Sequence, residues 1–152
     1  MKYLIIALLT IFNPVMAEDF RVGEVPASHK IGVKESDHLK TIFVTKDEKE
    51  IFSYEADLVT QQLLKFGLVK FKKMKEPHLV TVWSSGAHGQ ELIVFDLSKF
   101  SEKDKEASIV YLYGSAWTID MEINQERISI KGNKEVDAKT KLPVKEELTF
   151  RP

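Results

Sequence analysis

The residues best suited to chemistry lie in one short polar segment that contains Ser84, Ser85 and His88. A serine beside an imidazole could act as a nucleophile, because the imidazole can remove the hydroxyl proton. A working site also needs a third group that orients the imidazole, and such groups usually come from distant parts of the chain. The remote candidates for this group are the carboxylates Asp96, Asp120 and Glu122. The segment therefore leaves a hydrolase open as one alternative, with His88 as the base.

Other catalytic and metal-binding patterns are absent from the sequence. There is no cysteine, no G-x-S-x-G elbow and no phosphate-cradling glycine loop, and no two of the four histidines have metal-binding spacing. Asp120, Glu122 and Asn124 follow the 1, 3, 5 spacing of a calcium loop, but Gln125 stands where the turn requires glycine. The same three residues also fit the polar face of an alternating strand. The sequence therefore predicts no metal and no cofactor.

The polar segment is flanked by apolar runs at residues 79–83 and 92–95, the pattern of a β-hairpin covered on both faces. Gly86 and Gly89 supply the turn, and the serines can satisfy amides of the loop. Loops on a rigid scaffold commonly carry recognition, so this loop is also a candidate contact surface. Its candidate binding residues are Trp83, Ser84, Ser85, His88 and Gln90, with Trp117 as a further contributor if it is exposed.

Three segments within residues 69–97 carry a family resemblance: residues 77–80, 83–89 and 92–96. They resemble an integrin-like repeat of the FG-GAP or VCBS type, found in secreted bacterial proteins, in which an aspartate-rich calcium loop leads into a strand and a glycine-containing hairpin. Where such repeats carry the acidic loop, this chain has the sequence KKMKE at residues 72–76, and lysines supply no oxygen ligand. The resemblance therefore implies a blade-like antiparallel sheet without the calcium ion.

Ser85-Gly86-Ala87-His88 also begins like the S-G-x-x-Y loop that periplasmic lysozyme inhibitors, which are small β proteins, present to the active site of the enzyme. Gly89 stands at the tyrosine position, so the inhibitory role is not carried over. This similarity implies only a class of protein, a compact exported β domain that engages another protein through an exposed loop.

The first seventeen residues predict a cleavable secretory signal. Lys2 precedes an apolar run, and small residues up to Ala17 lie ahead of the charged Glu18. The apolar run is shorter than the about 20 residues that a membrane span needs. We therefore predict cleavage after Ala17, a single β domain over residues 18–152, a periplasmic or secreted location, and no membrane span in the mature chain.

From Phe20 onward the apolar residues recur mostly with a period of two, and turn residues separate these runs. This pattern predicts a mainly β fold, either an antiparallel two-sheet sandwich or a partly closed barrel. One short helix is predicted at residues 57–66, because Asp57 can cap it and Gly67 can end it. Its apolar residues Val59, Leu63 and Phe66 fall at helical spacing. Runs at 79–83, 92–95 and 109–113 are apolar on both faces, which predicts the middle of a sheet.

The charge balance restricts the class of partner. The chain has 22 Lys and Arg against 23 Asp and Glu, a net charge of −1 that becomes −2 when Lys2 is removed with the signal. Such a balance creates no field that would attract nucleic acid. A basic cluster occurs at Lys65, Lys70, Lys72, Lys73 and Lys75. We interpret it as a solvated edge that resists aggregation, with contact to an acidic partner or envelope polymer as the alternative.

Together these patterns predict an exported, non-enzymatic binding module that presents the loop at residues 84–90 to an envelope or extracellular protein, as an inhibitor would. One alternative is a hydrolase that acts on an envelope polymer with His88 as base. A second alternative is a structural subunit that pairs with its partner through an edge strand.

Overall fold

The computed structural model describes residues 17–57 and 60–152, and these residues form eleven strands in three sheets. Residues 1–16 of the predicted signal peptide lie outside the described residues. The central sheet has the order β1 (Glu18–Val22), β5 (Leu63–Val69), β6 (His78–Ser85), β7 (Gly89–Asp96) and β8 (Ile109–Ser115). The second sheet contains β11 (Pro143–Phe150), β10 (Ile128–Val136) and β9 (Asp120–Ile123), and the third contains β2 (His29–Glu35), β3 (Leu39–Lys46) and β4 (Lys49–Asp57).

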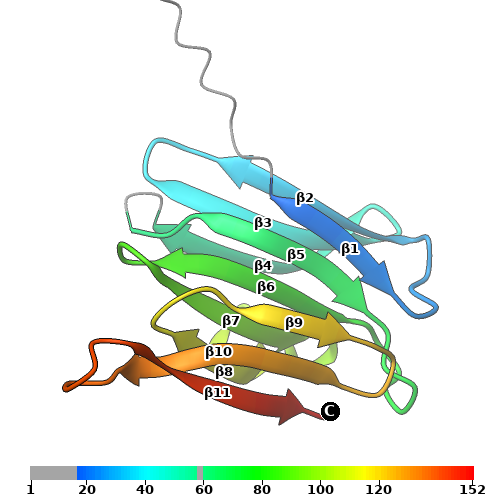
Figure 1. The fold of residues 1–152 in the computed structure, drawn as a ribbon. Coiled ribbons are helices and arrows are strands. Elements are labelled where there is room, and N and C mark those ends of the chain that lie inside the picture. Colours follow the sequence, from blue (N-terminus) through cyan, green and yellow to red (C-terminus); the bar gives the residue numbers. More distant parts are fainter. Residues whose placement is uncertain (1–16, 58–59) are drawn as a thin grey trace, which may run out of the picture.

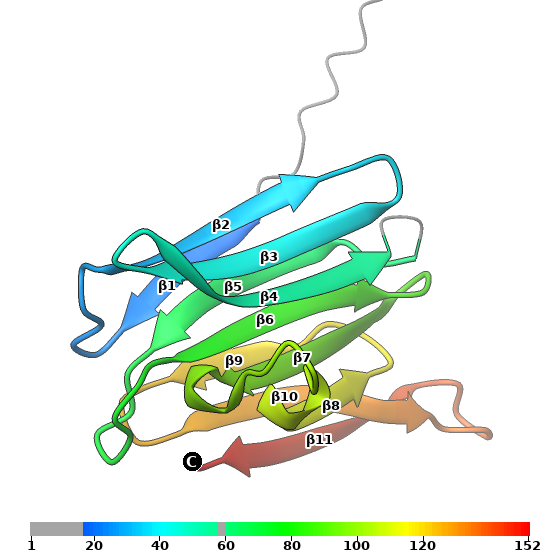
Figure 2. The same cartoon turned by 180° about the vertical axis from the view of Figure 1, so that it is seen from behind.

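The central sheet lies between the other two sheets. The β9–β10–β11 sheet covers part of one face (Figure 1), and the β2–β3–β4 sheet covers part of the opposite face (Figure 2). Two short 3-10 turns, η1 (Leu97–Lys99) and η2 (Glu106–Ser108), lie in the connection from β7 to β8. The molecule is therefore a β-sandwich of three layers with two separate cores.

The side chains of β6 show how the two cores form. Leu79 and Trp83 pack into the cluster shared with the β2–β3–β4 sheet, whereas Val80 and Val82 pack into the cluster shared with the β9–β10–β11 sheet. Successive side chains of a strand point to opposite faces, so a strand buried on both faces is apolar at most positions. The buried exception in this run of β6, Thr81, has a hydrogen-bond partner in the indole of Trp83. Removal of each such side chain from water contributes about 1.5–3 kcal/mol. The continuous apolar runs of β6 and β7 follow from this placement.

The predicted mainly β sandwich is confirmed, with three open sheets in place of two sheets or a partly closed barrel. The hairpin of β6 and β7 does occupy the middle of the central sheet, as predicted. Residues 109–113 do not, because β8 is the edge strand of that sheet and its Leu112 is 57% exposed. Val110, Tyr111 and Tyr113 of β8 pack in the second core, whereas Ile109 packs against the first.

The predicted helix at residues 57–66 is wrong for the part of it that the structure describes. Asp57 ends β4, and Leu63 begins β5, an interior strand of the central sheet. Gly67 does not end a helix but lies beside Phe20 of β1, which runs parallel to β5. A Cβ atom at Gly67 would lie 2.3 Å from atoms of Phe20, so the glycine makes room for this ring. The helical spacing arose because β5 is buried on both faces, which hides the strand period.

Candidate functional site

The polar loop at residues 84–90 is the predicted hairpin turn. β6 and β7 pair in register up to Ser85 and Gly89, so residues 86–88 form the turn itself. Gly86 has a φ of 63°, a left-handed conformation that favours glycine. The turn lies at the same end of the sandwich as the β8–β9 and β10–β11 connections (Figure 1). We call residues 84–90, 116–119 and 137–142 the aromatic end, because the rings of His88 and Trp117 stack there.

Trp83 belongs to the core and not to the surface of this loop. Its side chain is 0% exposed, and its indole N–H donates a hydrogen bond of 2.9 Å to the hydroxyl of Thr81. The ring of Tyr54 from β4 packs against it with a centroid distance of 5.9 Å. This placement removes Trp83 from the candidate contact residues.

Ser84 and Gln90 hold neighbouring segments in place. The Ser84 hydroxyl accepts a hydrogen bond of 2.7 Å from the backbone N–H of Gln62, which fixes the connection that leads into β5. The Gln90 side-chain oxygen accepts a bond of 2.8 Å from the backbone N–H of Ile119, which fixes the β8–β9 connection. Both side chains are half-buried and are engaged within the protein. Their roles are therefore structural in this arrangement.

Ser85 and His88 remain on the surface, and His88 has an aromatic partner. Its imidazole stacks on the indole of Trp117 with a centroid distance of 5.3 Å and an angle of 13° between the ring planes. Trp117 is 38% exposed. From the sequence, Trp117 was expected to contribute to the contact surface only if it was exposed. The two rings lie in different connections, and only the folded chain brings them together.

The connection that carries Trp117 is held by Ser115. The Ser115 hydroxyl accepts hydrogen bonds from the backbone N–H groups of Trp117 at 3.3 Å and Asn133 at 2.9 Å. The backbone N–H of Ala116 also donates to the carbonyl of Asn133 at 2.8 Å. The exposed indole therefore extends from a backbone that is fixed against β10.

In the described residues, none of the carboxylates considered for a hydrolytic site forms an ion pair with His88. Asp96 lies at the other end of β7, a strand that spans roughly 23 Å, and its carboxylate accepts hydrogen bonds from Ser98. Asp120 and Glu122 point outward from β9 and form its polar face.

The opposite end of the sandwich holds two buried histidines. His29 of β2 is 1% exposed, and its Nε2 lies 3.4 Å from a carboxylate oxygen of Glu76. Glu76 also pairs with Lys46 at 3.1 Å. Burial lowers the pKa of His29, and the charge of Lys46 acts in the same direction. The charge and hydrogen bond of Glu76 act to raise this pKa, but the net shift is downward and favours the neutral imidazole.

His78 of β6 is the second buried histidine, and it lies opposite Asp96 of β7. Burial lowers the pKa of His78, although the charge of Asp96 acts to raise it. Burial acts to raise the pKa of Asp96, but hydrogen bonds from Ser98 bring it below its ordinary value. This pair is thus a neutral imidazole beside an ionised carboxylate.

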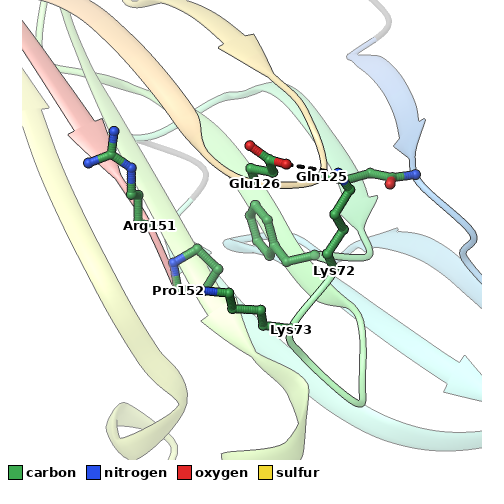
Figure 3. Close-up of a pocket in the computed structure, with 7 residues that line it drawn as sticks. Lys72, Lys73, Gln125, Glu126, Arg151 and Pro152 are labelled. Carbon is green, nitrogen blue, oxygen red and sulfur yellow. Dashed lines mark hydrogen bonds and ion pairs between the residues drawn. The ribbon is translucent and has the colours of Figure 1, made fainter.

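The basic cluster lies mostly in the β5–β6 connection and not on a strand, since β5 ends at Val69. A hollow of about 350 Å³ opens beside it, between this connection, the β9–β10 turn and the C-terminal residues (Figure 3). We call residues 70–78, 124–127 and 151–152 the basic end, and we include His29, because its Nε2 contacts Glu76 of this segment. None of the residues of the hairpin loop at 84–90 lines this hollow.

Two other features of the described residues bear on function. No group of three or more His, Asp or Glu side chains in them is placed to hold a metal ion. No helix within them is long and apolar enough to cross a membrane.

Comparison with known proteins gave no match: no protein-family model, no curated protein and no solved structure is significantly similar to this chain. The resemblances of the central hairpin to an integrin-like repeat and to lysozyme inhibitors therefore stay predictions.

Proposed function

We propose that this protein is an exported binding module that engages a protein of the envelope or the extracellular space through its aromatic end. The observation that carries the proposal is the exposed stack of His88 on Trp117. Aromatic side chains are enriched where proteins recognise each other, because they bury much area and lose little conformational entropy on binding.

The surroundings of the stacked pair support a contact surface. The β10–β11 hairpin extends at the same end (Figure 1) and carries three of the exposed apolar side chains, Val136, Leu142 and Val144. Exposed apolar groups beside polar ones are typical of interaction sites. The fixed backbone of the turn and of the Trp117 connection lowers the entropy that binding would cost.

Affinity capture from an envelope extract tests the proposal, with wild type and a His88→Ala, Trp117→Ala variant as bait. We expect proteins that wild type retains to be lost from the variant, and a His38→Ala variant to retain them, since His38 is exposed on the separate β2–β3 connection. Recovery of the same proteins by all three baits would refute the assignment to the aromatic end.

A spectroscopic measurement then examines the contact directly. The chain has two tryptophans, and Trp83 is fully buried, so acrylamide quenches the fluorescence of Trp117 preferentially. We expect a captured partner to protect Trp117 from the quencher. Unchanged quenching in the complex would place the interface elsewhere.

A further inference from the structure

The hollow at the basic end is lined by positive side chains from separate segments. Lys72 and Lys73 come from the β5–β6 connection, and Arg151 follows β11. Figure 3 shows Lys72 and Arg151 on different sides of the hollow, with Glu126 from the β9–β10 turn between them. A ligand in the hollow would therefore meet cations from more than one direction.

The positive side chains that line the hollow outnumber the negative ones. Lys72 is paired with Glu126 at 2.8 Å. Lys73 and Arg151 take part in no ion pair among the described residues. Glu126 is the one acidic side chain among the residues that line the hollow. Two cations are thus left available to a ligand.

The ion pair of Lys72 with Glu126 at 2.8 Å indicates that cations at this place stabilise a negative oxygen. The hydrogen bond and charge of Lys72 lower the pKa of Glu126, and the charges of Arg127 and Lys73 act in the same direction. Glu126 therefore behaves as an internal anion at the edge of the hollow. An external anion placed beside it would meet the same cations, with Glu126 as its competitor.

The wall of the hollow is fixed by backbone hydrogen bonds. The N–H of Lys72 donates to the carbonyl of Gln125 at 2.9 Å, and the N–H of Lys70 donates to the carbonyl of Val22 at 2.9 Å. The ring of Phe71 lies edge-on to the ring of Phe150, at a centroid distance of 6.1 Å. The backbone that carries Lys72 is thus held in place before a ligand arrives, which reduces the entropic cost of binding.

We propose that this hollow binds a small molecule that carries a phosphate group. A phosphate has nearly two negative charges at neutral pH and several acceptor oxygens, which suits a lysine and an arginine that approach from different segments. A volume of about 350 Å³ is at the lower end of the range for small-molecule sites. The site is separate from the aromatic end and does not depend on the function proposed there.

To test this site, residues 18–152 are titrated with inorganic phosphate at low ionic strength. Binding is measured from the amide chemical shifts. We expect saturable shifts in residues 70–75 and 124–127. A Lys73→Gln, Arg151→Gln variant should bind phosphate at least tenfold more weakly. Glu126→Gln should bind it several-fold more tightly, because this change removes the competing carboxylate and frees Lys72.

Two control proteins separate this site from general electrostatics and from the other end. Lys139→Gln removes an exposed lysine of the β10–β11 connection and should leave phosphate binding unchanged. The His88→Ala, Trp117→Ala variant should also bind phosphate as wild type does. The tighter binding of Glu126→Gln cannot come from misfolding, which keeps the test decisive even if another variant folds poorly.

Absence of saturable shifts in wild type would overturn the proposal, and so would equal affinities in wild type, Glu126→Gln and the double variant. A third arm uses vesicles that contain phosphatidic acid. Binding to these vesicles without binding to free phosphate would assign the cations to a membrane surface and would also overturn the proposed small-molecule site.

Discussion

The two ends of the sandwich use their side chains in opposite ways. At the aromatic end, polar side chains such as Ser84 and Gln90 are turned inward to hold loops, while the rings of His88 and Trp117 are exposed. At the basic end, aromatic and imidazole rings such as Phe71 and His78 are buried, and the lysines face solvent. One end of the sandwich therefore exposes aromatic rings, and the other exposes cations.

The two tryptophans provide the strongest test of this comparison. Trp83→Ala removes a fully buried ring from the strand that joins both ends and should lower the free energy of unfolding by about 3–5 kcal/mol. Trp117→Ala should lower it by less than about 1 kcal/mol, because that ring is exposed. Urea denaturation measures both values. Equal losses would show that Trp117 is part of the core and not a contact residue.

The buried histidines of the basic end predict an acid-sensitive stability. Folding lowers the pKa of His29 and His78, so below about pH 6.5 the unfolded chain binds more protons than the folded one. Stability is therefore complete above that pH and falls as the pH decreases below it, by at most about 1.4 kcal/mol per pH unit for each histidine.

Urea denaturation at pH 7.5 and pH 5.5 should show this loss, and it should persist in His88→Ala, which removes the exposed histidine of the aromatic end. A His78→Gln variant should show a smaller loss than wild type. Titration of the imidazole proton resonances checks the cause. If the resonances of His29 and His78 in the folded protein titrate at or above pH 6.5, the explanation fails.

The smallest expected effect concerns the serines of the aromatic end. Ser84→Ala removes the acceptor for the Gln62 amide and should cost about 1 kcal/mol. The amide of Gln62 should also exchange its hydrogen faster. Ser85→Ala is the matched control, because Ser85 is exposed, and it should change neither quantity measurably. Identical behaviour of the two variants would show that Ser84 does not anchor the connection before β5.

The sequence allowed the mainly β fold and the central hairpin to be predicted, because strands at residues 79–83 and 92–95 are apolar at successive positions. The same burial misled the interpretation of residues 63–66, where apolar side chains on both faces of β5 imitate helical spacing. The number of sheets was underestimated for a related reason. A strand covered on both faces indicates two covering layers, but it does not say which segments provide them.

Neither end could have been assembled from the sequence alone. Two strands, β7 and β8, separate His88 from Trp117 in the sequence, and the distance between them along the chain does not indicate that their rings stack. The hollow combines Lys73, Glu126 and Arg151, which three different parts of the fold bring together. The basic cluster was visible in the sequence, but its partner residues depend on the contact between the β5–β6 connection and the β9–β10 turn.

The parallel pairing of β1 with β5 has a consequence for the order of folding. β1 is the first strand in the described residues, and its partner β5 begins at Leu63, after the whole β2–β3–β4 sheet in the sequence. Those three strands can form by local hairpins, whereas β1 must wait for a distant partner. We therefore expect β1 to dock after the β2–β3–β4 sheet has formed, when the ring of Phe20 packs onto Gly67.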